Sequence, residues 1–413
     1  MTAAVRGPLG LFLLALAIRL GALVVAANTG TFPDFWEPDV LARNLLAGHG
    51  YVYPELGTWY RAYMEPLYPG LVAAVYLVTG FSVWALGLVQ CVLGALLAPV
   101  VHALTRRTFG GAAAAAAGVL VAVHPGLAGY GVKFHPLVLD SLLLALVGLA
   151  LVALLQTPSA RGGLVFGGAL GLCVLSRPTV LGFVALVVAG AMLARRRQGL
   201  PRALAIGIVT AAVVVAPWVV RNYRALDAFV LTRTNVGYVF WLGNHPGTTG
   251  GAGDPSDPQG NQSLFALAPP ALYARVTAAG EIEQNRILMA EALAYVRAEP
   301  AAFVGRYVRK LAYFWTFPPY GGKRYAGWQV TVYLAFYAAL ALAALAGLWR
   351  AWRHPVPGQG PGLAVAVLLP VTVAATQALF YIEGRHRLAI EALLAVPAGY
   401  AVAALRERFR PRP

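Results

Sequence analysis

The sequence carries little charge. Asp, Glu, Lys and Arg make up only 12% of its 413 residues, whereas about a quarter is usual in a soluble domain. Apolar residues make up 59% and stand in long blocks rather than in alternating or heptad patterns. Several blocks reach the roughly 20 residues that a helix needs to cross the hydrocarbon core of a bilayer. The composition therefore excludes a soluble protein and predicts an all-α polytopic membrane protein.

Cysteines and nucleotide-binding motifs are also scarce or missing. The only two cysteines, Cys91 and Cys173, lie inside apolar blocks, which excludes a disulfide framework and a Cys-x-x-Cys metal site. The sequence contains neither a Walker nor a Rossmann fingerprint, and neither Gly-x-Ser-x-Gly nor His-Glu-x-x-His. A soluble nucleotide is therefore not indicated as a substrate.

The net charge of +16 would suggest nucleic acid as a partner if the protein were soluble. The arginines instead form short tracts between the apolar blocks, which is the positive-inside pattern of cytoplasmic loops. Nucleic acid is therefore not expected as a partner. The tracts are Arg106-Arg107, Arg161, Arg195 to Arg197, Arg350 with Arg353, and Arg406 to Arg412.

The apolar blocks predict ten spanning helices, and an amino terminus on the cytoplasmic side puts every arginine tract there. The first block is too long for a signal peptide and is expected to be a retained helix. The segment 67–80 is apolar but short, so we expect a re-entrant or interfacial helix and ten to twelve crossings in all. The predicted spans are 8–27, 84–104, 111–124, 136–156, 163–176, 178–194, 203–222, 326–348, 361–380 and 388–405.

The acidic residues support this topology. Of the sixteen Asp and Glu, five lie in 28–66, seven in 223–325 and one, Glu383, in 381–387. Thirteen acids thus lie on the face opposite the arginine tracts. The sequence predicts two large outer loops there, with helices near 40–47 and 281–297 and an irregular segment from Gly243 to Gly260.

Four acidic residues are candidates for acid–base chemistry. Asp34, Glu37 and Asp39 follow the first span among aromatic residues, where desolvation raises a carboxylate's basicity and suits a general base. The alternative is a set of solvated loop acids beside an interfacial aromatic belt. Glu65 lies with Arg61 where the chain re-enters the bilayer. It forms either part of a site or an interfacial ion pair.

Several cations lie on the expected outer face, where positive charge is unusual. Lys133 needs an anionic partner there, either a carboxylate such as Asp140 or a phosphate. His124 and His135 lack the spacing of a metal site. Cations from separate helix ends could bind the phosphate of a membrane lipid, although single arginines also snorkel to headgroups. The arginines concerned are Arg177, Arg221, Arg385 and Arg387.

Six stretches, in order along the chain, resemble the polyprenyl-phosphate-sugar-dependent glycosyltransferases of the GT-C fold. The resemblance is to the dolichyl-phosphate-mannose–protein mannosyltransferase-like group, glycosyltransferase family 39, which includes the lipid A aminoarabinose transferases. The stretches are Asp34 to Tyr51, Met64 to Pro69, Leu175 to Pro178, Ala216 to Tyr223, Gly237 to Gly250 and Gly384 to Leu388.

The resemblance implies a seven-helix catalytic module at 1–222, an outer region at 223–325, and C-terminal helices with a basic tail at 326–413. It also implies that Asp34 is the catalytic carboxylate and that Glu65 is the acid of the re-entry segment. Pro38 stands where the family usually has an aromatic residue, so Glu37 or Asp39 could hold the catalytic role instead. In the region of the family's second outer acid this chain has Lys133 and His135, followed by Asp140.

The function implied is an inverting transfer of a sugar from a polyprenyl-phosphate carrier to a protein, lipid or envelope glycan. The expected place is the outer face of the inner (plasma) membrane. Lys133, His135, Arg177, Arg221, Arg385 and Arg387 are the candidate phosphate-binding residues. No cofactor is implied with certainty, and a divalent metal is left open. The alternatives are a transporter or flippase of an anionic lipid, and a non-catalytic scaffold subunit.

Overall fold

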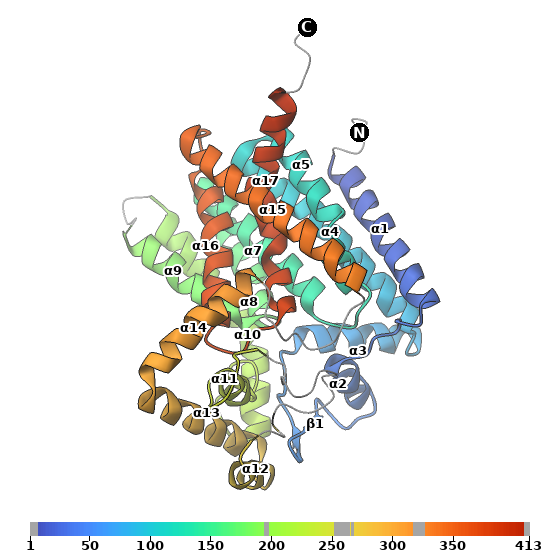
Figure 1. Cartoon of the computed structure of the whole chain (residues 1–413), viewed down its shortest axis with the longest axis vertical. Helices are drawn as coiled ribbons and strands as arrows, with labels where there is room; N and C mark the ends of the chain where they lie inside the picture. The colour runs from blue at the N-terminus through green and yellow to red at the C-terminus, as the bar shows by residue number, and fades with distance from the viewer. Residues whose placement is uncertain (1–6, 194–197, 252–264, 266–267, 317–326, 409–413) are drawn as a thin grey trace.

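The computed structural model describes residues 7–193, 198–251, 265, 268–316 and 327–408. Its long helices stand side by side in a bundle (Figure 1). They are α1 (Pro8–Asn28), α4 (Val83–Phe109), α5 (Gly111–Ala122), α7 (Leu137–Gln156), α8 (Ala160–Val174), α9 (Leu181–Leu193), α10 (Leu200–Leu226), α15 (Gly327–Arg353), α16 (Gly360–Gln377) and α17 (Gly384–Arg408). Each of the ten predicted spans overlaps one of these helices, which confirms the all-α polytopic fold.

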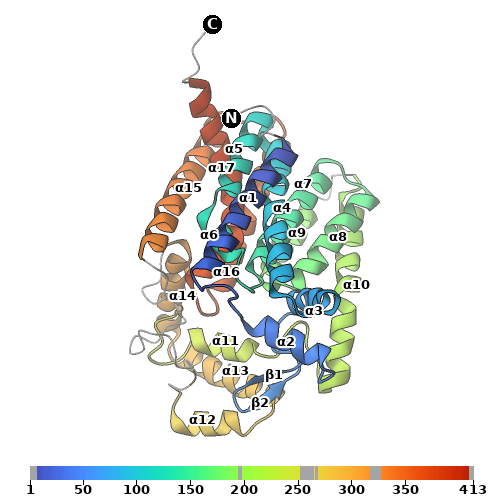
Figure 2. The same ribbon diagram turned by 90° about the vertical axis from the view of Figure 1, so that its right-hand side faces the viewer.

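Within the described residues, seven helices are long and apolar enough to cross a membrane. They are α1, α4, α7, α10, α15, α16 and α17, while α5, α8 and α9 are shorter apolar helices in the same bundle. The helix α3 (Leu67–Thr79) lies across the end of the bundle rather than along it (Figures 1 and 2). This orientation agrees with the interfacial helix predicted for 67–80.

The bundle has two distinct ends. The terminal end is the one at which α1 begins and α17 ends, and the loop end is opposite to it (Figure 1). The loop end carries most of the remaining elements (Figures 1 and 2). These elements are α2 (Glu37–Leu46), β1 (Tyr53–Glu55), β2 (Thr58–Tyr60), α6 (Pro125–Tyr130), a 3₁₀ turn (Pro178–Val180), α11 (Val236–Gly243), α12 (Pro270–Thr277), α13 (Glu281–Ala298) and α14 (Pro300–Trp315).

Local sequence explains where several helices begin and end. Ser82 caps α4 by accepting a hydrogen bond from the Ala85 N–H at 3.2 Å, and Gly110 ends that helix with a φ of 87°. Glu37 and Asp39 lie in the first turn of α2, where negative charge favours the helix dipole. The prediction of a helix near 40–47 is confirmed, and it begins three residues earlier.

Small residues bring α8 and α10 together. Gly163, Gly167 and Gly171 recur every four residues and therefore form one stripe on α8. A Cβ added at Gly167 would overlap the carbonyl group of Gly207 on α10. Close backbone approach through small residues is the usual way for membrane helices to associate, because lipid tails are as apolar as leucine side chains.

A buried carboxylate joins the two outer regions at the loop end. Glu281, at the start of α13, accepts hydrogen bonds from the N–H of Arg61 at 2.8 Å and of Ala62 at 3.3 Å. It also accepts one from the Thr234 hydroxyl at 2.8 Å. The Tyr60 hydroxyl donates to Gln284 one turn further along α13. The segment around Ala62 is thus fixed by residues far away in sequence.

The second outer region contains more helix than the sequence indicates. The helix predicted at 281–297 is present as α13, but α11, α12 and α14 were not predicted. From Asn244 to Gly251 the chain is irregular, as expected, while 252–260 lies outside the described residues. The buried Lys310 ammonium of α14 donates to Gly243 O at 3.2 Å, Asn244 Oδ1 at 3.0 Å and Leu379 O at 3.3 Å. Burial lowers the pKa of Lys310 to about 7.

The arrangement of the two ends can be tested with single cysteines in a Cys91→Ser/Cys173→Ser background. Trp59 and Tyr273 are exposed at the loop end, and Gln198 and Trp352 at the terminal end. We expect Trp59→Cys and Tyr273→Cys in intact cells to react together with a membrane-impermeant maleimide.

Gln198→Cys and Trp352→Cys should react only after the membrane is permeabilised. Labelling of Gln198→Cys together with Tyr273→Cys in intact cells would contradict the arrangement.

Candidate active site

Asp34 and Lys133 form an ion pair at the loop end. The Lys133 Nζ lies 2.6 Å from Asp34 Oδ2, and the side chains are 13% and 9% exposed. The backbone also joins them, because the Phe134 N–H donates to Asp34 O at 3.1 Å. The Gln90 amide of α4 donates to the carbonyl of Lys133 from within the bundle. Lys133 therefore pairs with a protein carboxylate, as the sequence allowed, but the carboxylate is that of Asp34 and not of Asp140.

Trp36 lies between two of the predicted cationic residues. Its ring meets the His135 ring edge-on with the centroids 5.1 Å apart, and the Arg385 guanidinium carbon is 4.8 Å from its centroid. Arg385 also pairs with Glu383, with Nε 2.5 Å from Oε2. Burial raises the pKa of Glu383, and this effect exceeds the lowering of the pKa by the neighbouring Arg385. Trp36, in the segment that follows α1, is thus in contact with Arg385 at the start of α17.

His135 is neutral at pH 7. Burial, reinforced by Arg385, Arg177 and Lys133, lowers its pKa well below the ordinary value. Its Nδ1 accepts a hydrogen bond from the Leu137 N–H at 3.2 Å, which leaves the proton on Nε2. His135 can therefore donate a hydrogen bond to an anion but contributes no charge.

Glu37 and Asp39 differ in their surroundings. Both Asp39 oxygens are engaged, one by the Tyr76 hydroxyl at 2.5 Å and the other by Arg43 Nε at 2.8 Å. In the described part of the chain, no hydrogen bond or ion pair engages the half-buried Glu37 carboxylate. Its charge contributes to raising the pKa of Glu383, so Glu37 lies within electrostatic reach of the Glu383–Arg385 pair. Glu37 is available for chemistry, whereas Asp39 fastens α2 to α3.

Glu65 lies beside a cation that the sequence did not single out. The Arg233 Nε is 3.4 Å from Glu65 Oε1, and Glu65 is buried. The Tyr51 hydroxyl donates to Met64 O at 3.0 Å, and the Leu67 N–H donates to Leu175 O at 3.1 Å, which fixes the re-entry segment on α8. Arg233 has no local signal in the sequence, since it is one of several arginines spread over the segment 223–325.

Arg177 is engaged by the protein itself. Its Nη1 lies 3.2 Å from Asp140 Oδ2, and its Nη2 donates to His386 O at 3.2 Å. The Ser176 hydroxyl donates to the other Asp140 oxygen at 2.6 Å. Arg177 therefore ties α7 to the first turn of α17 and helps to position Arg385.

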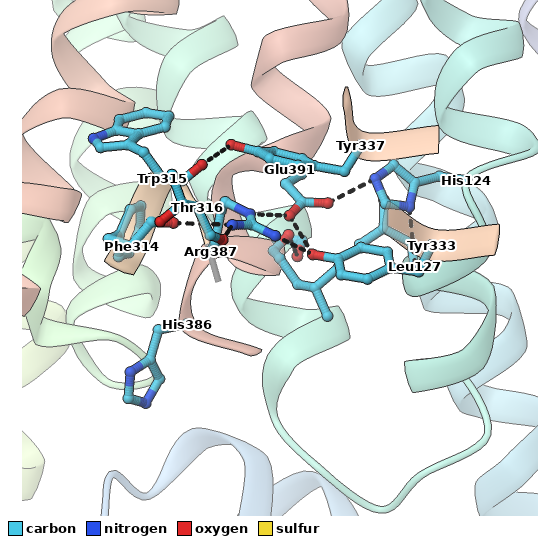
Figure 3. Close-up of polar contacts among 12 residues, drawn as sticks. His124, Leu127, Phe314, Trp315, Thr316, Tyr333, Tyr337, His386, Arg387 and Glu391 are labelled. Carbon is cyan, nitrogen blue, oxygen red and sulfur yellow. Dashed lines mark hydrogen bonds and ion pairs between the residues drawn. The ribbon is translucent and has the colours of Figure 1, made fainter. Parts of the chain in front are cut away.

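Arg387 is buried inside the bundle. Figure 3 shows its guanidinium among Glu391, Tyr333 and the carbonyls at the end of α14. The Nε lies 2.6 Å from Glu391 Oε1, and Nη2 donates to the Tyr333 hydroxyl at 2.9 Å. Nη1 donates to Phe314 O at 3.2 Å and to Thr316 O. The second Glu391 oxygen lies 2.9 Å from His124 Nε2.

Arg221 lies at the loop end of α10, beside the first outer region. Its guanidinium carbon is 4.9 Å from the Trp218 centroid and 5.5 Å from that of Tyr51. Nη1 donates to Arg61 O, and Nη2 to Tyr51 O at 3.4 Å. It is half-buried and therefore retains some exposed surface.

The fold thus brings one group of predicted residues together and separates others from it. Contacts connect Asp34 with Lys133, and connect His135 and Arg385 through Trp36. Glu37 lies within electrostatic reach of the Glu383–Arg385 pair. Among the described residues, no group of three or more His, Cys, Asp and Glu side chains is placed to hold a metal ion. The arrangement offers a carboxylate next to fixed cations, which suits proton removal beside a departing anion.

Comparisons with known proteins agree with the resemblance in the sequence. Residues 64–220 match the family model described as dolichyl-phosphate-mannose-protein mannosyltransferase. A search of the curated proteins found no match to this chain. The resemblance to GT-C glycosyltransferases is therefore confirmed by a family model that covers the central part of the chain.

Solved structures of low sequence identity share the fold. The apo oligosaccharyltransferase of Archaeoglobus fulgidus superposes with a TM-score of 0.58 at 14% identity, over 97% of this chain and 51% of that one. The same enzyme, AglB, with an inhibitory peptide and a dolichol-phosphate gives 0.59 at 14% identity, over 98% and 52%. ArnT from Cupriavidus metallidurans with undecaprenyl phosphate gives a TM-score of 0.46 at 16% identity, over 95% of this chain and 77% of that one. The chain has the GT-C fold and spans about half the length of the archaeal enzyme.

The environment of Arg387 predicts a large effect on stability. Arg387→Ala would leave the buried Glu391 carboxylate without its paired guanidinium, and breaking a buried ion pair in this way costs about 3–5 kcal/mol. We expect a clear fall in the thermal unfolding temperature of the purified protein, measured by intrinsic fluorescence in detergent.

Arg275→Ala is the control, since its pair with Glu291 at 2.9 Å is solvent-exposed. Exposed pairs contribute about 0–1 kcal/mol. Equal unfolding temperatures for the two variants would contradict the structural role of Arg387.

Proposed function

We propose that this protein is a glycosyltransferase that moves a sugar from a polyprenyl-phosphate carrier to an acceptor at the loop end of the bundle. The observation that carries the proposal is the Asp34 carboxylate held 2.6 Å from the Lys133 ammonium, with Trp36, two residues further on, in contact with both Arg385 and His135. The family model and the shared fold with an oligosaccharyltransferase support it. The structure of that enzyme with a dolichol-phosphate supports a polyprenyl type of carrier.

The proposed reaction is a single in-line displacement. An acceptor hydroxyl or amine attacks the anomeric carbon of the carrier-linked sugar and forms the new glycosidic bond. The bond from that carbon to the phosphate oxygen breaks, and its electron pair leaves with the polyprenyl phosphate. Asp34 takes the acceptor proton, which accelerates attack by about 10²–10⁴-fold. The configuration at the anomeric carbon inverts, and the sugar–phosphate bond supplies the energy.

Lys133 has two roles in this mechanism. Without substrate, its ammonium pairs with the Asp34 carboxylate at 2.6 Å. A bound carrier phosphate competes for the same ammonium, so part of the Lys133 interaction passes to the phosphate and Asp34 becomes a better proton acceptor. The departing phosphate then gathers charge beside fixed cations, each of which contributes on the order of 10²–10³-fold to the rate.

We assign the phosphate to Lys133 and Arg385, with His135 as a neutral hydrogen-bond donor and Arg221 at the edge toward the first outer region. Arg177 and Arg387 act through the protein, because their side chains are less exposed (10% and 1%) than those of Lys133 and Arg385 (13% and 18%). Glu65 and its partner Arg233 face the same end of the bundle and position the re-entry segment. A divalent metal is not needed for any step of this proposal.

The orientation follows from the positive-inside rule. Among the described residues, Arg106-Arg107, Arg161 and Arg350 with Arg353 lie at the ends of α4, α8 and α15 that border the terminal end. The described parts of the acid-rich segments 28–66 and 223–325 lie at the loop end. The loop end then faces outward from the inner (plasma) membrane. In this division 1–222 is the catalytic module, 223–325 the outer region and 326–413 the supporting helices. The acceptor is a protein, a lipid or an envelope glycan.

Replacing Asp34 decides between this enzyme and a transporter or scaffold. Asp34→Asn keeps the size of the side chain but cannot take the acceptor proton, so turnover should fall by about 10²-fold or more. Carrier binding should persist or tighten, because Lys133 loses a competing negative charge. The measurement is release of polyprenyl phosphate by purified protein from a panel of polyprenyl-phosphate sugars.

Glu37→Gln and Asp39→Asn are matched controls, and both should transfer more rapidly than Asp34→Asn. Loss of transfer only in Glu37→Gln would move the base to Glu37 and leave the reaction class intact. Near-normal transfer by all three variants would refute the mechanism. Absence of transfer by the parent chain with every donor would favour the transporter or scaffold.

A second prediction concerns the carrier phosphate. Arg385→Ala should raise the KM for the carrier lipid by about tenfold or more, because a charge-assisted contact in a water-poor site is lost. Arg202→Ala is the control, since Arg202 is exposed at the terminal end of α10. Equal changes in KM for both variants would indicate general electrostatics instead of a phosphate site.

A further inference from the structure

An apolar groove lies at the other end of the molecule from the proposed reaction. It has a volume of about 250 Å³ and is formed by α7, α9, α10 and α16 in the half of the bundle near the terminal end. Leu186 of α9 and Leu368 of α16 are exposed, so the groove opens on the side of the bundle that faces lipid. Its lining includes Leu151, Leu155, Phe183, Leu204 and Val365, all of them apolar.

The groove continues into a more polar cavity. This second cavity has a volume of about 390 Å³ and shares Leu155 with the groove. Its other lining residues include Gln156 at the end of α7, Gln198 before α10, and Gly358 before α16. All three stand at the terminal end, so the groove leads from the apolar side of the bundle to its polar end.

A cation stands at this polar mouth without a carboxylate. Arg107 Nη1 donates to Gln156 Oε1 at 3.1 Å, and Gln156 Nε2 donates to Arg107 O at 3.0 Å. Within the described ranges, no carboxylate lies within ion-pair distance of Arg107, which is exposed. Of the acids within the described residues, Glu407 alone belongs to a segment at this end. The mouth therefore carries uncompensated positive charge.

The two parts of this site select different parts of an amphiphile. A lipid tail gains little by leaving other tails for a leucine-lined groove, because both surroundings are equally apolar. The groove thus accepts a single acyl chain by its shape, and discrimination among lipids must come from the headgroup. Arginine at a cytoplasmic interface attracts anionic headgroups, and guanidinium groups bind phosphate with fixed geometry.

We propose that this groove binds an acidic glycerophospholipid of the leaflet at the terminal end. Its phosphate lies at the mouth beside Arg107 and Gln156, and one acyl chain lies between α9 and α16. The bound chain fills the space beside α9, whose packing partners in the bundle are chiefly α16 and α10. The proposal is independent of the glycosyltransferase reaction, because it involves none of the residues assigned to it.

Glycine substitutions test the groove without disturbing the core. Gly190 lines the groove on α9, and Gly168 lies on α8 outside it; a Cβ at either position would meet nothing within 4 Å. The delipidated full-length protein is mixed with detergent micelles that contain phosphatidylglycerol or phosphatidylcholine. The readouts are the thermal unfolding temperature and native mass spectrometry of bound lipid.

For the unmodified protein and Gly168→Phe, we expect phosphatidylglycerol to raise the unfolding temperature more than phosphatidylcholine and to remain bound. Gly190→Phe should lose this difference, because its ring occupies the groove. Arg107→Gln should bind phosphatidylglycerol on the order of fivefold more weakly, with phosphatidylcholine unaffected.

Three results would overturn the proposal. The first is equal stabilisation of the unmodified protein by both phospholipids. The second is loss of the difference in Gly168→Phe as well as in Gly190→Phe. The third is binding of undecaprenyl phosphate, but not phosphatidylglycerol, that Gly190→Phe abolishes, which would assign the groove to the carrier tail.

Discussion

The pair between Asp34 and Lys133 is the interaction on which the loop end depends. A lysine in a water-poor interface is costly unless a negative charge accompanies it, and this lysine lies 99 residues along the chain from its partner. Meeting that requirement brings the segment after α1 against the connection between α6 and α7. Trp36 then reaches His135 and Arg385, and α2 begins immediately after it. One electrostatic requirement thus sets the position of the whole candidate site.

The bundle could be predicted from the sequence because hydrophobicity in long blocks is a local property. Each apolar block needs only its own residues to form a helix, since all backbone hydrogen bonds are made within it. The helices α11, α12 and α14 were not predicted because they are short or amphipathic and depend on tertiary contacts. Lys310 illustrates the difficulty, since a lysine inside a core becomes intelligible only when Gly243, Asn244 and Leu379 surround it.

The candidate site was predictable as a set of residues but not as a set of partners. Lys133, Arg177 and Arg387 were singled out because positive charge is unusual on the outer face, where the predicted topology puts them. Sequence cannot say which anion compensates each cation, because such pairs join helices that are distant along the chain. Asp140 pairs with Arg177 rather than Lys133, and Arg387 pairs with Glu391 inside the bundle. Arg233 escaped notice because its partner, Glu65, approaches only through the folding of the re-entry segment.

The Glu281 carboxylate has a consequence for the order of biosynthesis. It fixes the backbone of Arg61, which is made 220 residues earlier. At about 5–20 residues per second, the ribosome needs roughly 10–45 s to cover that interval. During this time the first outer segment can already hold Asp34 and Lys133 together, but the chain around Ala62 has no lasting partner. The nascent protein therefore passes through a stage in which the charge pair is assembled but the backbone at Arg61 and Ala62 still lacks its hydrogen bonds to Glu281. At this stage the segment is exposed to proteases and chaperones outside the membrane.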